Sequence, residues 1–255
     1  MLEISNLTKS FGGVEAMKDV SLDFPAGSLT AVIGPNGAGK TTFFNLISGH
    51  VPADRGEVRL DGEDVIGLSS REIVRRGMCR AFQVASIFPD MTMEESLTAA
   101  ATARRGELFS LLRRAPLPAA RARAREIMDL LGLTARAGAL SRNLSHGEQK
   151  LLDIALALAL EPKVLLLDEP TAGMGAEERW RMIEKVHALW EATDLTVIFI
   201  EHDMDIVFRI AQSIDVLSYG KVLARGTPEE IRRNQDVIDA YLGQDHQHAE
   251  PESAP

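Results

Sequence analysis

The chain has 255 residues, an apolar fraction of 45%, a charged fraction of 25% and a formal net charge of −9. This length suffices for one large α/β domain or a domain with an insertion, and the composition is ordinary for a soluble globular protein. The negative balance argues against non-specific nucleic-acid binding, so we expect no nucleic-acid partner.

Targeting and membrane-spanning segments are not expected. Cys79 is the single cysteine, so no disulfide forms within the chain, which fits a reducing cytosol. The first residues have no basic segment followed by an apolar run, which argues against a signal peptide. The apolar stretch 154–167 is interrupted at Glu161-Pro162-Lys163, and each half is too short to cross a bilayer.

The N-terminal part of the chain predicts strands around a glycine-rich loop. Apolar alternation or continuous apolar runs predict strands at residues 2–7, 20–24, 28–33 and 57–60. Asp61-Gly62 after the last of these indicates a hairpin edge. Residues 40–48 predict a helix, with Gly49 placed to cap its end.

The glycine-rich loop predicts a nucleotide site. Gly34-Pro35-Asn36-Gly37-Ala38-Gly39-Lys40-Thr41 fits the pattern G-x-x-x-x-G-K-[ST] between a strand and a helix. Glycines let the backbone N–H groups wrap phosphates, and the helix N-terminus adds partial positive charge. Lys40 is placed to reach the β- and γ-phosphates, Thr41 to ligate Mg²⁺, and Thr42 to contact the α-phosphate side.

Strand signals stop between residues 89 and 142, where helical patterns dominate. Helices are predicted at 93–103 and 119–131, with a loop or short helix between them. This all-helical block indicates an insertion into an α/β body. Seven arginines and one glutamate between residues 104 and 125 give this part a charge of +6. They are placed to meet lipid headgroups or an acidic partner, or to form a solvated face.

The pattern of a parallel sheet returns after the insertion. The predicted elements are a helix capped by Ser145 and running to about residue 160, strand 164–167, helix 176–191, and strands 195–200, 214–217 and 222–224. Thr227-Pro228-Glu229-Glu230 is a capping box that starts another helix. The polar residues 244–255, with His246 and His248, predict a disordered tail.

The strand 164–167 leads into two acidic residues, Asp168 and Glu169. A continuous apolar run is typical of a central parallel strand. Asp168 at its end suits an outer ligand of Mg²⁺, because this ion keeps several waters. Glu169 is placed to polarise an attacking water as a general base. The alternative is a glutamate that only caps the loop before Pro170.

A second element that favours an anion is Leu144-Ser145-His146-Gly147-Glu148-Gln149. Ser145 offers a hydroxyl, Gly147 allows close backbone approach, and the segment starts a helix, although an ordinary helix cap would also account for Ser145. The stretch resembles the signature Leu-Ser-Gly-Gly-Gln of ABC transporter ATPases. With the glycine-rich loop and the acidic strand, the resemblance extends over residues 1 to about 243.

The resemblance implies roles for particular residues. It implies that Ser145 and Gly147 bind the γ-phosphate of an ATP held by a second ATP-binding subunit, in a head-to-tail homo- or heterodimer. It also implies that Gln83 joins Mg²⁺ and the attacking water to a transmembrane partner, that His202 contacts the γ-phosphate, and that Phe11 stacks on adenine. The alternatives are a surface glutamine, a satisfied loop histidine and a core phenylalanine.

Two positions depart from the usual family pattern. His146 replaces the commonest glycine, and a histidine here resembles the branched-chain amino-acid importer group. After Pro170-Thr171 the family usually has Ser-Ala-Leu-Asp, whereas this chain has Ala172-Gly173-Met174-Gly175. The aspartate that makes a contact across the family's dimer is therefore missing.

The resemblance implies an α/β fold: a P-loop NTPase (ABC ATPase) core with a parallel sheet, an N-terminal antiparallel β-subdomain and an α-helical insertion. The expected domain is 1–243, with a helical subdomain at about 89–160 and a tail at 244–255. The implied function is the ATP-binding and hydrolysing subunit of an ABC importer for branched-chain or related amino acids or similar small polar solutes. Such a subunit is cytoplasmic and peripheral on the inner face of the cell membrane, with transmembrane permease subunits and a solute-binding protein as partners.

Other functions use the same catalytic core. His146 favours an importer over an exporter or a lipid-extraction ATPase. A soluble ABC ATPase that acts on DNA or ribosomes would have a long coiled coil or a second cassette, and the sequence has neither pattern. A module that binds ATP without hydrolysing it is disfavoured by the presence of both Glu169 and His202.

Overall fold

The computed structural model describes residues 1–81, 87–104 and 118–245. They form two compact units: Met1–Gly67 with Ile200–Pro255, and Leu68–Phe199. Within the described residues, no helix is long and apolar enough to span a lipid bilayer.

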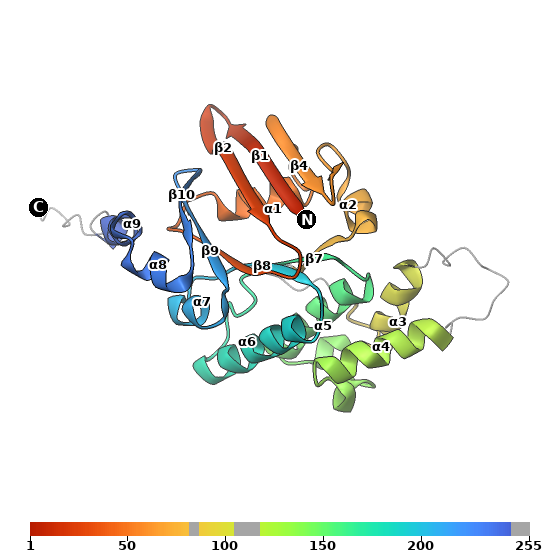
Figure 1. Ribbon diagram of the computed structural model, residues 1–255. Helices are drawn as coiled ribbons and strands as arrows, with labels where there is room; N and C mark the ends of the chain where they lie inside the picture. The colour runs from red at the N-terminus through yellow and green to blue at the C-terminus, as the bar shows by residue number, and fades with distance from the viewer. Residues whose placement is uncertain (82–86, 105–117, 246–255) are drawn as a thin grey trace, which may run out of the picture. The chain divides into compact units, whose positions relative to one another are not determined.

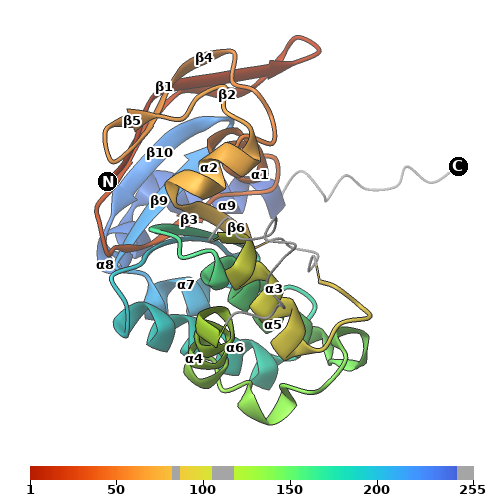
Figure 2. The ribbon, with the colours of Figure 1, turned by 90° about the vertical axis from the view of Figure 1, so that its right-hand side faces the viewer.

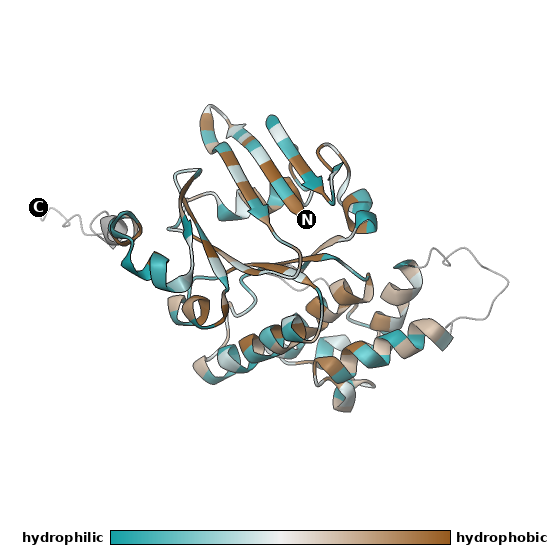
Figure 3. Ribbon diagram, viewed as in Figure 1, coloured by the Kyte–Doolittle hydropathy of each residue, from teal (hydrophilic) through white to brown (hydrophobic). Residues whose placement is uncertain are grey.

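The first unit contains a four-stranded antiparallel sheet. Its strands lie in the order β2 (Val14–Phe24), β1 (Leu2–Phe11), β4 (Arg55–Leu60) and β5 (Glu63–Asp64). Hydropathy alternates along β1, β2 and β4 (Figure 3), and Leu2, Ile4 and Leu7 are buried. One face of the sheet is therefore a core face, and the predicted antiparallel β-subdomain is confirmed.

Three further strands of the first unit carry the glycine-rich loop. The buried strand β3 (Leu29–Ile33) lies parallel to β9 (Ser213–Ser218), which pairs antiparallel with β10 (Lys221–Gly226). Helix α1 (Lys40–Ile47), labelled in Figure 1, follows β3 and its loop. Gly49 just beyond it adopts a left-handed conformation with φ of 70°. Strand, loop and helix thus follow one another as predicted.

The rest of the first unit is helical. Its helices are α7 (Met204–Ile210), α8 (Pro228–Arg233) and α9 (Gln235–Asp245). The predicted capping box at Thr227 and Glu230 is confirmed at the start of α8. Gln244 and Asp245, at the start of the predicted tail, belong to α9, because a formed helix tolerates polar residues in its last turn. Residues 246–255, with His246 and His248, lie outside the described residues.

The second unit contains three strands, in the order β8 (Thr196–Ile200), β7 (Val164–Asp168) and β6 (Met78–Ala81), where the last residue of β8 belongs to the first unit. Strands β6 and β7 are parallel, with Arg80 opposite Leu166 and Ala81 opposite Leu167. Every residue of β7 and β8 is buried, as their continuous apolar sequences predict.

Helices make up the remainder of the second unit. They are α2 (Ser70–Arg76), α3 (Met93–Arg104), α4 (Pro118–Leu130), α5 (His146–Ala159) and α6 (Ala176–Glu191), with short 3₁₀ turns at Thr134–Arg136 and Ser141–Asn143. Helices α3, α4 and α5 contact one another (Figure 2), which confirms the helical insertion. Residues 105–117, including Arg105, Arg113 and Arg114, lie outside the described residues.

Of the four described arginines between residues 104 and 125, three have acidic partners on the surface, and Arg104 donates to the backbone carbonyl of Arg75. Arg121 and Arg125 both reach Glu94 of α3, at 2.8 and 3.3 Å, and Arg123 reaches Glu126 at 3.3 Å. All three arginine side chains remain at least one third exposed. This geometry agrees with the solvated face and leaves less unpaired positive charge than the sequence suggests.

The sequence did not predict two short helices, α2 and α7. Helix α2 has a capping box of Ser69 and Glu72 and a left-handed Gly77 at its end, and α7 is capped by Asp203. Each has only seven residues, too few to show a helical period clearly.

Candidate active site

The predicted site residues divide between the two units. The first unit carries Phe11, residues 34–42 and His202, and the second carries Ser145, Gly147, Asp168 and Glu169. Gln83 lies outside the described residues.

The conformation of the glycine-rich loop requires two of its glycines. Gly34 has φ of 150°, and a Cβ atom there would lie 2.1 Å from the carbonyl oxygen of Leu217. Gly39 has φ of 102°, and its Cβ would lie 2.8 Å from the carbonyl oxygen of Ala16. Because both obstacles are backbone atoms, neither can move aside as a flexible side chain could. The loop is thus held against β9 and the start of β2 by contacts that only glycine allows.

The start of α1 is arranged for an anion. Its N-cap, Gly39, offers no side-chain hydrogen bond, whereas α2, α5 and α8 each begin with a capping box. A helix start without a side-chain cap presents its first N–H groups to a ligand, and phosphate suits them. Nζ of the buried Lys40 donates to the carbonyl oxygens of Gly34 and Pro35, at 2.6 and 3.1 Å. Its ammonium group therefore lies inside the loop, next to where phosphates would bind.

Other predicted residues of the first unit are accessible. Phe11, at the end of β1, is 48% exposed, and Nζ of Lys9 lies 5.4 Å from its ring centroid. A core role for Phe11 is therefore wrong, and its ring is open to stack on a base. His202 follows β8 and is exposed, and its backbone N–H donates to the Glu201 carboxylate at 3.2 Å. Thr41 is also exposed, so its hydroxyl can meet a cation.

Asp168 is a buried carboxylate with a cationic partner. It lies at the end of β7, and its Oδ2 is 2.5 Å from Nη2 of Arg80 on β6. The two side chains are 7% and 6% exposed. Arg80 lies opposite Leu166, two residues before Asp168 on the same side of β7, so the two side chains share one face of the strands.

Glu169 has an unusual backbone that a second cation supports. Its φ is +48°, the left-handed region that non-glycine residues seldom adopt and that is often found at functional sites. Nζ of the buried Lys150, on α5, donates to the Glu169 carbonyl at 2.7 Å, and the N–H of Ala172 donates to the same oxygen at 3.1 Å. The half-buried Glu169 side chain is thus carried on a defined turn after β7.

The residues present fit a Mg²⁺ that arrives with a nucleotide. Among the described residues, no group of three or more His, Cys, Asp or Glu gathers into a metal cluster. Mg²⁺ commonly binds through one or two carboxylates, several waters and substrate phosphates, and does not need a protein cage. Asp168 in the second unit is a carboxylate of the kind that this ion uses, and the exposed Thr41 in the first unit offers a hydroxyl oxygen.

Ser145 caps α5 as predicted. Its Oγ accepts from the N–H of Glu148 at 3.3 Å, and the Glu148 carboxylate accepts from the N–H of Ser145 at 2.8 Å. A hydroxyl that accepts one hydrogen bond still has its own proton to donate. The helix cap and an anion contact are therefore compatible at this exposed residue.

The two departures from the family pattern lie against each other. A Cβ atom at Gly173 would lie 3.2 Å from Cε1 of the exposed His146 ring. Gly147 is close to another segment in the same way, because a Cβ there would lie 2.2 Å from Oε1 of Glu178. Gly175, where the family usually has aspartate, is the N-cap of α6 and makes no side-chain cap.

Four residues that lie next to predicted site residues had no predicted role: Arg80, Lys150, Glu178 and Tyr241. Tyr241, on α9, hydrogen-bonds to the backbone of Gly34, and burial raises the pKa of its phenol to about 12. Arg80 had one signal in the sequence, since it interrupts the apolar run from Met78 to Phe82, whereas Lys150 ends a polar stretch and had none. No sequence signal marks Glu178 or Tyr241.

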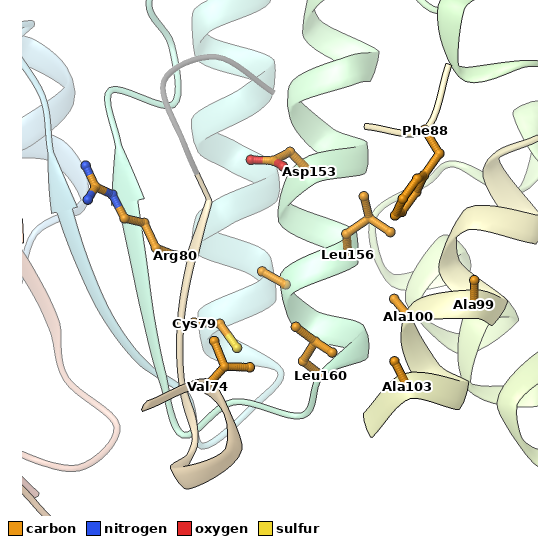
Figure 4. A pocket seen from close by; sticks show the side chains of 11 residues that line it. Val74, Cys79, Arg80, Phe88, Ala99, Ala100, Ala103, Asp153, Leu156 and Leu160 are labelled. Atoms are coloured by element: carbon orange, nitrogen blue, oxygen red, sulfur yellow. The ribbon is translucent and has the colours of Figure 1, made fainter. Parts of the chain in front are cut away.

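An apolar groove lies beside β6 in the second unit. Its volume is about 410 Å³, and α3, α5 and β6 supply most of its lining. Figure 4 shows Leu156 and Leu160 of α5 facing Ala100 and Ala103 of α3, while the guanidinium of Arg80 points away from the groove.

Comparison with known proteins agrees with this geometry. Residues 17–172 match the family model described as ABC transporter, and residues 221–247 match one described as branched-chain amino acid ATP-binding cassette transporter. The chain is 39% identical to the high-affinity branched-chain amino acid transport ATP-binding protein BraF of Pseudomonas aeruginosa, over 96% of this chain and 98% of that protein. It is 38% identical to LivG of Salmonella typhimurium, a protein of the same description, over 96% and 98% of the two chains.

Solved structures share the fold. The ADP conformation of MJ1267, an ATP-binding cassette of an ABC transporter, superposes with a TM-score of 0.84 at 29% identity, over 95% of this chain and 98% of that one. The dimeric post-hydrolysis state of the cassette MJ0796, bound to ADP and Pi, gives 0.74 at 26% identity, over 89% and 99%. The phosphate loop, the acidic strand and the capped helix α5 thus occur in a chain that belongs to the ABC transporter family, as an ATPase coupled to transport.

Proposed function

We propose that this chain binds ATP with Mg²⁺ and hydrolyses it to drive uptake of branched-chain amino acids through separate permease subunits. The observation that carries the substrate class is the end-to-end similarity to BraF and LivG, whose names state branched-chain amino acid transport. The match of residues 221–247 to a model of the same description supports it independently of the catalytic motifs.

In the first unit, the proposed contacts are to the nucleotide. The backbone of Gly34, Pro35, Asn36, Gly37, Ala38 and Gly39 and the start of α1 surround the phosphates. Lys40 turns from the loop carbonyls to the β- and γ-phosphates, Thr41 and Thr42 add hydroxyls, and Phe11 stacks on adenine. Base stacking on an aromatic ring contributes about 1–3 kcal/mol. His202 donates to the γ-phosphate.

In the second unit, the proposed contacts are to Mg²⁺ and the attacking water. Asp168 and Gln83 would hold Mg²⁺, which would neutralise phosphate charge when bound, and Glu169 is proposed as the general base. The left-handed backbone of Glu169, held by Lys150, supports the proposed base because a fixed turn limits where the carboxylate can lie.

The working assembly is a head-to-tail dimer with a second ATP-binding subunit, in which Ser145 and Gly147 meet the γ-phosphate bound by the partner. The donor proton left on Ser145 and the helix N-terminus of α5 support this contact. The dimeric cassette MJ0796 shows that the fold can assemble in pairs. Because Gly175 replaces aspartate, this dimer lacks one cross-subunit contact of the usual kind.

The permease docks in the groove between α3, α5 and β6. The groove is lined mainly by alanine, leucine and valine side chains, which suit the apolar face of a short permease helix. This docking places the chain at the cytoplasmic face of the membrane. A solute-binding protein completes the importer and selects the amino acid.

The function is tested by reconstituting the chain with its own permease and solute-binding subunits in vesicles. ATP should drive uptake of radiolabelled leucine, isoleucine or valine, and Glu169→Gln should bind ATP but abolish uptake and turnover. Uptake of an unrelated solute, such as Fe³⁺, in place of these amino acids would refute the substrate class. Near wild-type hydrolysis by Glu169→Gln would refute the general base.

A further inference from the structure

We propose that Arg80 is a positioning residue that serves as the counter-cation of Asp168 in the metal-free protein and opposes divalent-cation binding at this carboxylate. The inference rests on the proposed role of Asp168 toward Mg²⁺. Arg80 then has a defined role at Asp168, and the direction in which it changes metal affinity can be measured.

The ion pair is built into the sheet. Strands β6 and β7 are parallel neighbours, and their register puts Arg80 on the same face as Leu166 and Asp168. Nη2 of Arg80 lies 2.5 Å from Oδ2 of Asp168, across 88 residues of sequence. Arg80 and Asp168 both belong to paired strands, β6 at the edge of the sheet and β7 beside it, so neither residue lies on a loop.

Burial makes the pair strong. The Arg80 and Asp168 side chains are 6% and 7% exposed, so water solvates neither charge well. A buried carboxylate without a partner is strongly disfavoured, and removal of one member of a buried pair leaves the other charge uncompensated. In the metal-free protein, Arg80 therefore supplies the positive charge that Asp168 requires.

A divalent cation near Asp168 would supply the same charge. Two cations beside one carboxylate repel each other, and the repulsion is weakly screened at a buried site. Arg80 also occupies Oδ2, one of the two oxygens that could accept from a metal-bound water. The guanidinium must therefore share the carboxylate or withdraw from it when a divalent cation binds.

A thermodynamic cycle predicts whether removal of Arg80 raises or lowers the affinity for a divalent cation. Removal of Arg80 destabilises the metal-free protein, in which Asp168 is left without its partner, more than the metal-bound protein, in which the metal replaces it. The difference between the two costs equals the gain in metal affinity. A residue that only organised the site would give the opposite sign, because its loss would weaken metal binding.

The experiment uses Mn²⁺ as the probe, titrated into the full-length chain saturated with ADP and followed by electron paramagnetic resonance of free Mn²⁺. Arg80→Met keeps the length of the side chain and removes its charge. Its Mn²⁺ dissociation constant should fall about tenfold, equivalent to about 1.4 kcal/mol. Arg142→Met is the matched control, because Arg142 forms an ion pair with Asp90 in the same unit in which both side chains are more than half exposed. This control should bind Mn²⁺ like wild type.

Two further variants distinguish a wrong role for Asp168 from a wrong role for Arg80. Asp168→Asn should weaken Mn²⁺ binding, and if it does not, the proposed role of Asp168 is wrong. If Asp168→Asn weakens binding but Arg80→Met leaves it unchanged or weaker, the proposal for Arg80 is overturned while the role of Asp168 stands. Should Arg80→Met fail to fold, Arg80→Gln serves instead, because glutamine also removes the charge but keeps N–H donors for the buried carboxylate. Its Mn²⁺ affinity should exceed that of wild type, and an equal or lower affinity would overturn the proposal.

Discussion

Replacement of Lys150 by methionine should slow ATP hydrolysis without weakening nucleotide binding. Lys150 is 3% exposed on α5, and its ammonium donates to the carbonyl of Glu169, the proposed general base. Methionine has a similar length and fills the same buried space without a donor. The substitution therefore removes the hydrogen bond while disturbing the packing of α5 little.

The size of the expected fall in kcat follows from the hydrogen bond between Lys150 and the Glu169 carbonyl, which the substitution removes. A hydrogen bond from a charged donor contributes about 1.5–3 kcal/mol, and here it stabilises a backbone with φ of +48° that a glutamate rarely adopts. If the transition state needs this turn and the nucleotide-bound ground state does not, kcat should fall roughly ten- to a hundredfold. The dissociation constant for ATP should change little, since Lys40 and the phosphate loop are untouched.

The assay is steady-state ATPase activity together with equilibrium binding of a fluorescent ATP analogue. Lys185→Met is the matched control, because Lys185 also donates to a backbone carbonyl, that of Leu131, in the same unit. Both variants lose a similar bond, so any general loss of stability should be comparable. A Lys150→Met enzyme with kcat within twofold of wild type, or no slower than Lys185→Met, would refute the reasoning.

Three further outcomes can be checked with simple variants. Gly34→Ala should lower the melting temperature of the nucleotide-free chain by more than Gly37→Ala, because a Cβ at Gly34 meets a backbone oxygen at 2.1 Å whereas nothing lies within 4 Å of one at Gly37; equal losses would contradict the steric argument. Ser145→Arg should leave ATP binding largely intact and abolish hydrolysis, and lost binding would show that Ser145 serves the nucleotide of its own chain. Burial raises the pKa of Asp215 to about 7 from 3.8, so the folded state favours the protonated carboxyl. The protonated Asp215 carboxyl stabilises the fold fully below pH 4, and this stabilisation is lost as the pH rises through 7. Because an asparagine stays neutral at every pH, Asp215→Asn should raise the melting temperature more at pH 8 than at pH 5. An equal change at both pH values would contradict this assignment.

Much of the fold was predictable because it depends on local rules. The capping box of Thr227 with Glu230 and the cap of Ser145 on α5 depend on residues three apart, and both form as predicted. The return contact from Glu148, which completes a capping box at Ser145, was not predicted. The buried strands β3 and β7 were visible as continuous apolar runs. Helices α2 and α7 were missed because a seven-residue helix shows hardly two turns of its period.

The residues that contact Asp168 and Glu169 could not be predicted from the sequence. The sequence places Arg80 within an apolar run and Lys150 at the end of a polar stretch, but it does not show which carboxylate or carbonyl each side chain contacts. That choice depends on β6 lying beside β7 in one register and on α5 packing near the turn after β7. The contact between His146 and Gly173 likewise joins two family departures that lie 27 positions apart in the sequence.

The sequence by itself determined the class of this protein, because the phosphate loop, the acidic strand and the signature helix are short segments whose chemistry follows from their own residues and spacing. It also determined which glycines and caps form each of these segments. Only the tertiary structure decided what holds the two acidic residues: Arg80 for the side chain of Asp168 and Lys150 for the backbone of Glu169. Buried cations find their partners through strand order, register and helix packing, and these are properties of the folded chain that no local pattern specifies.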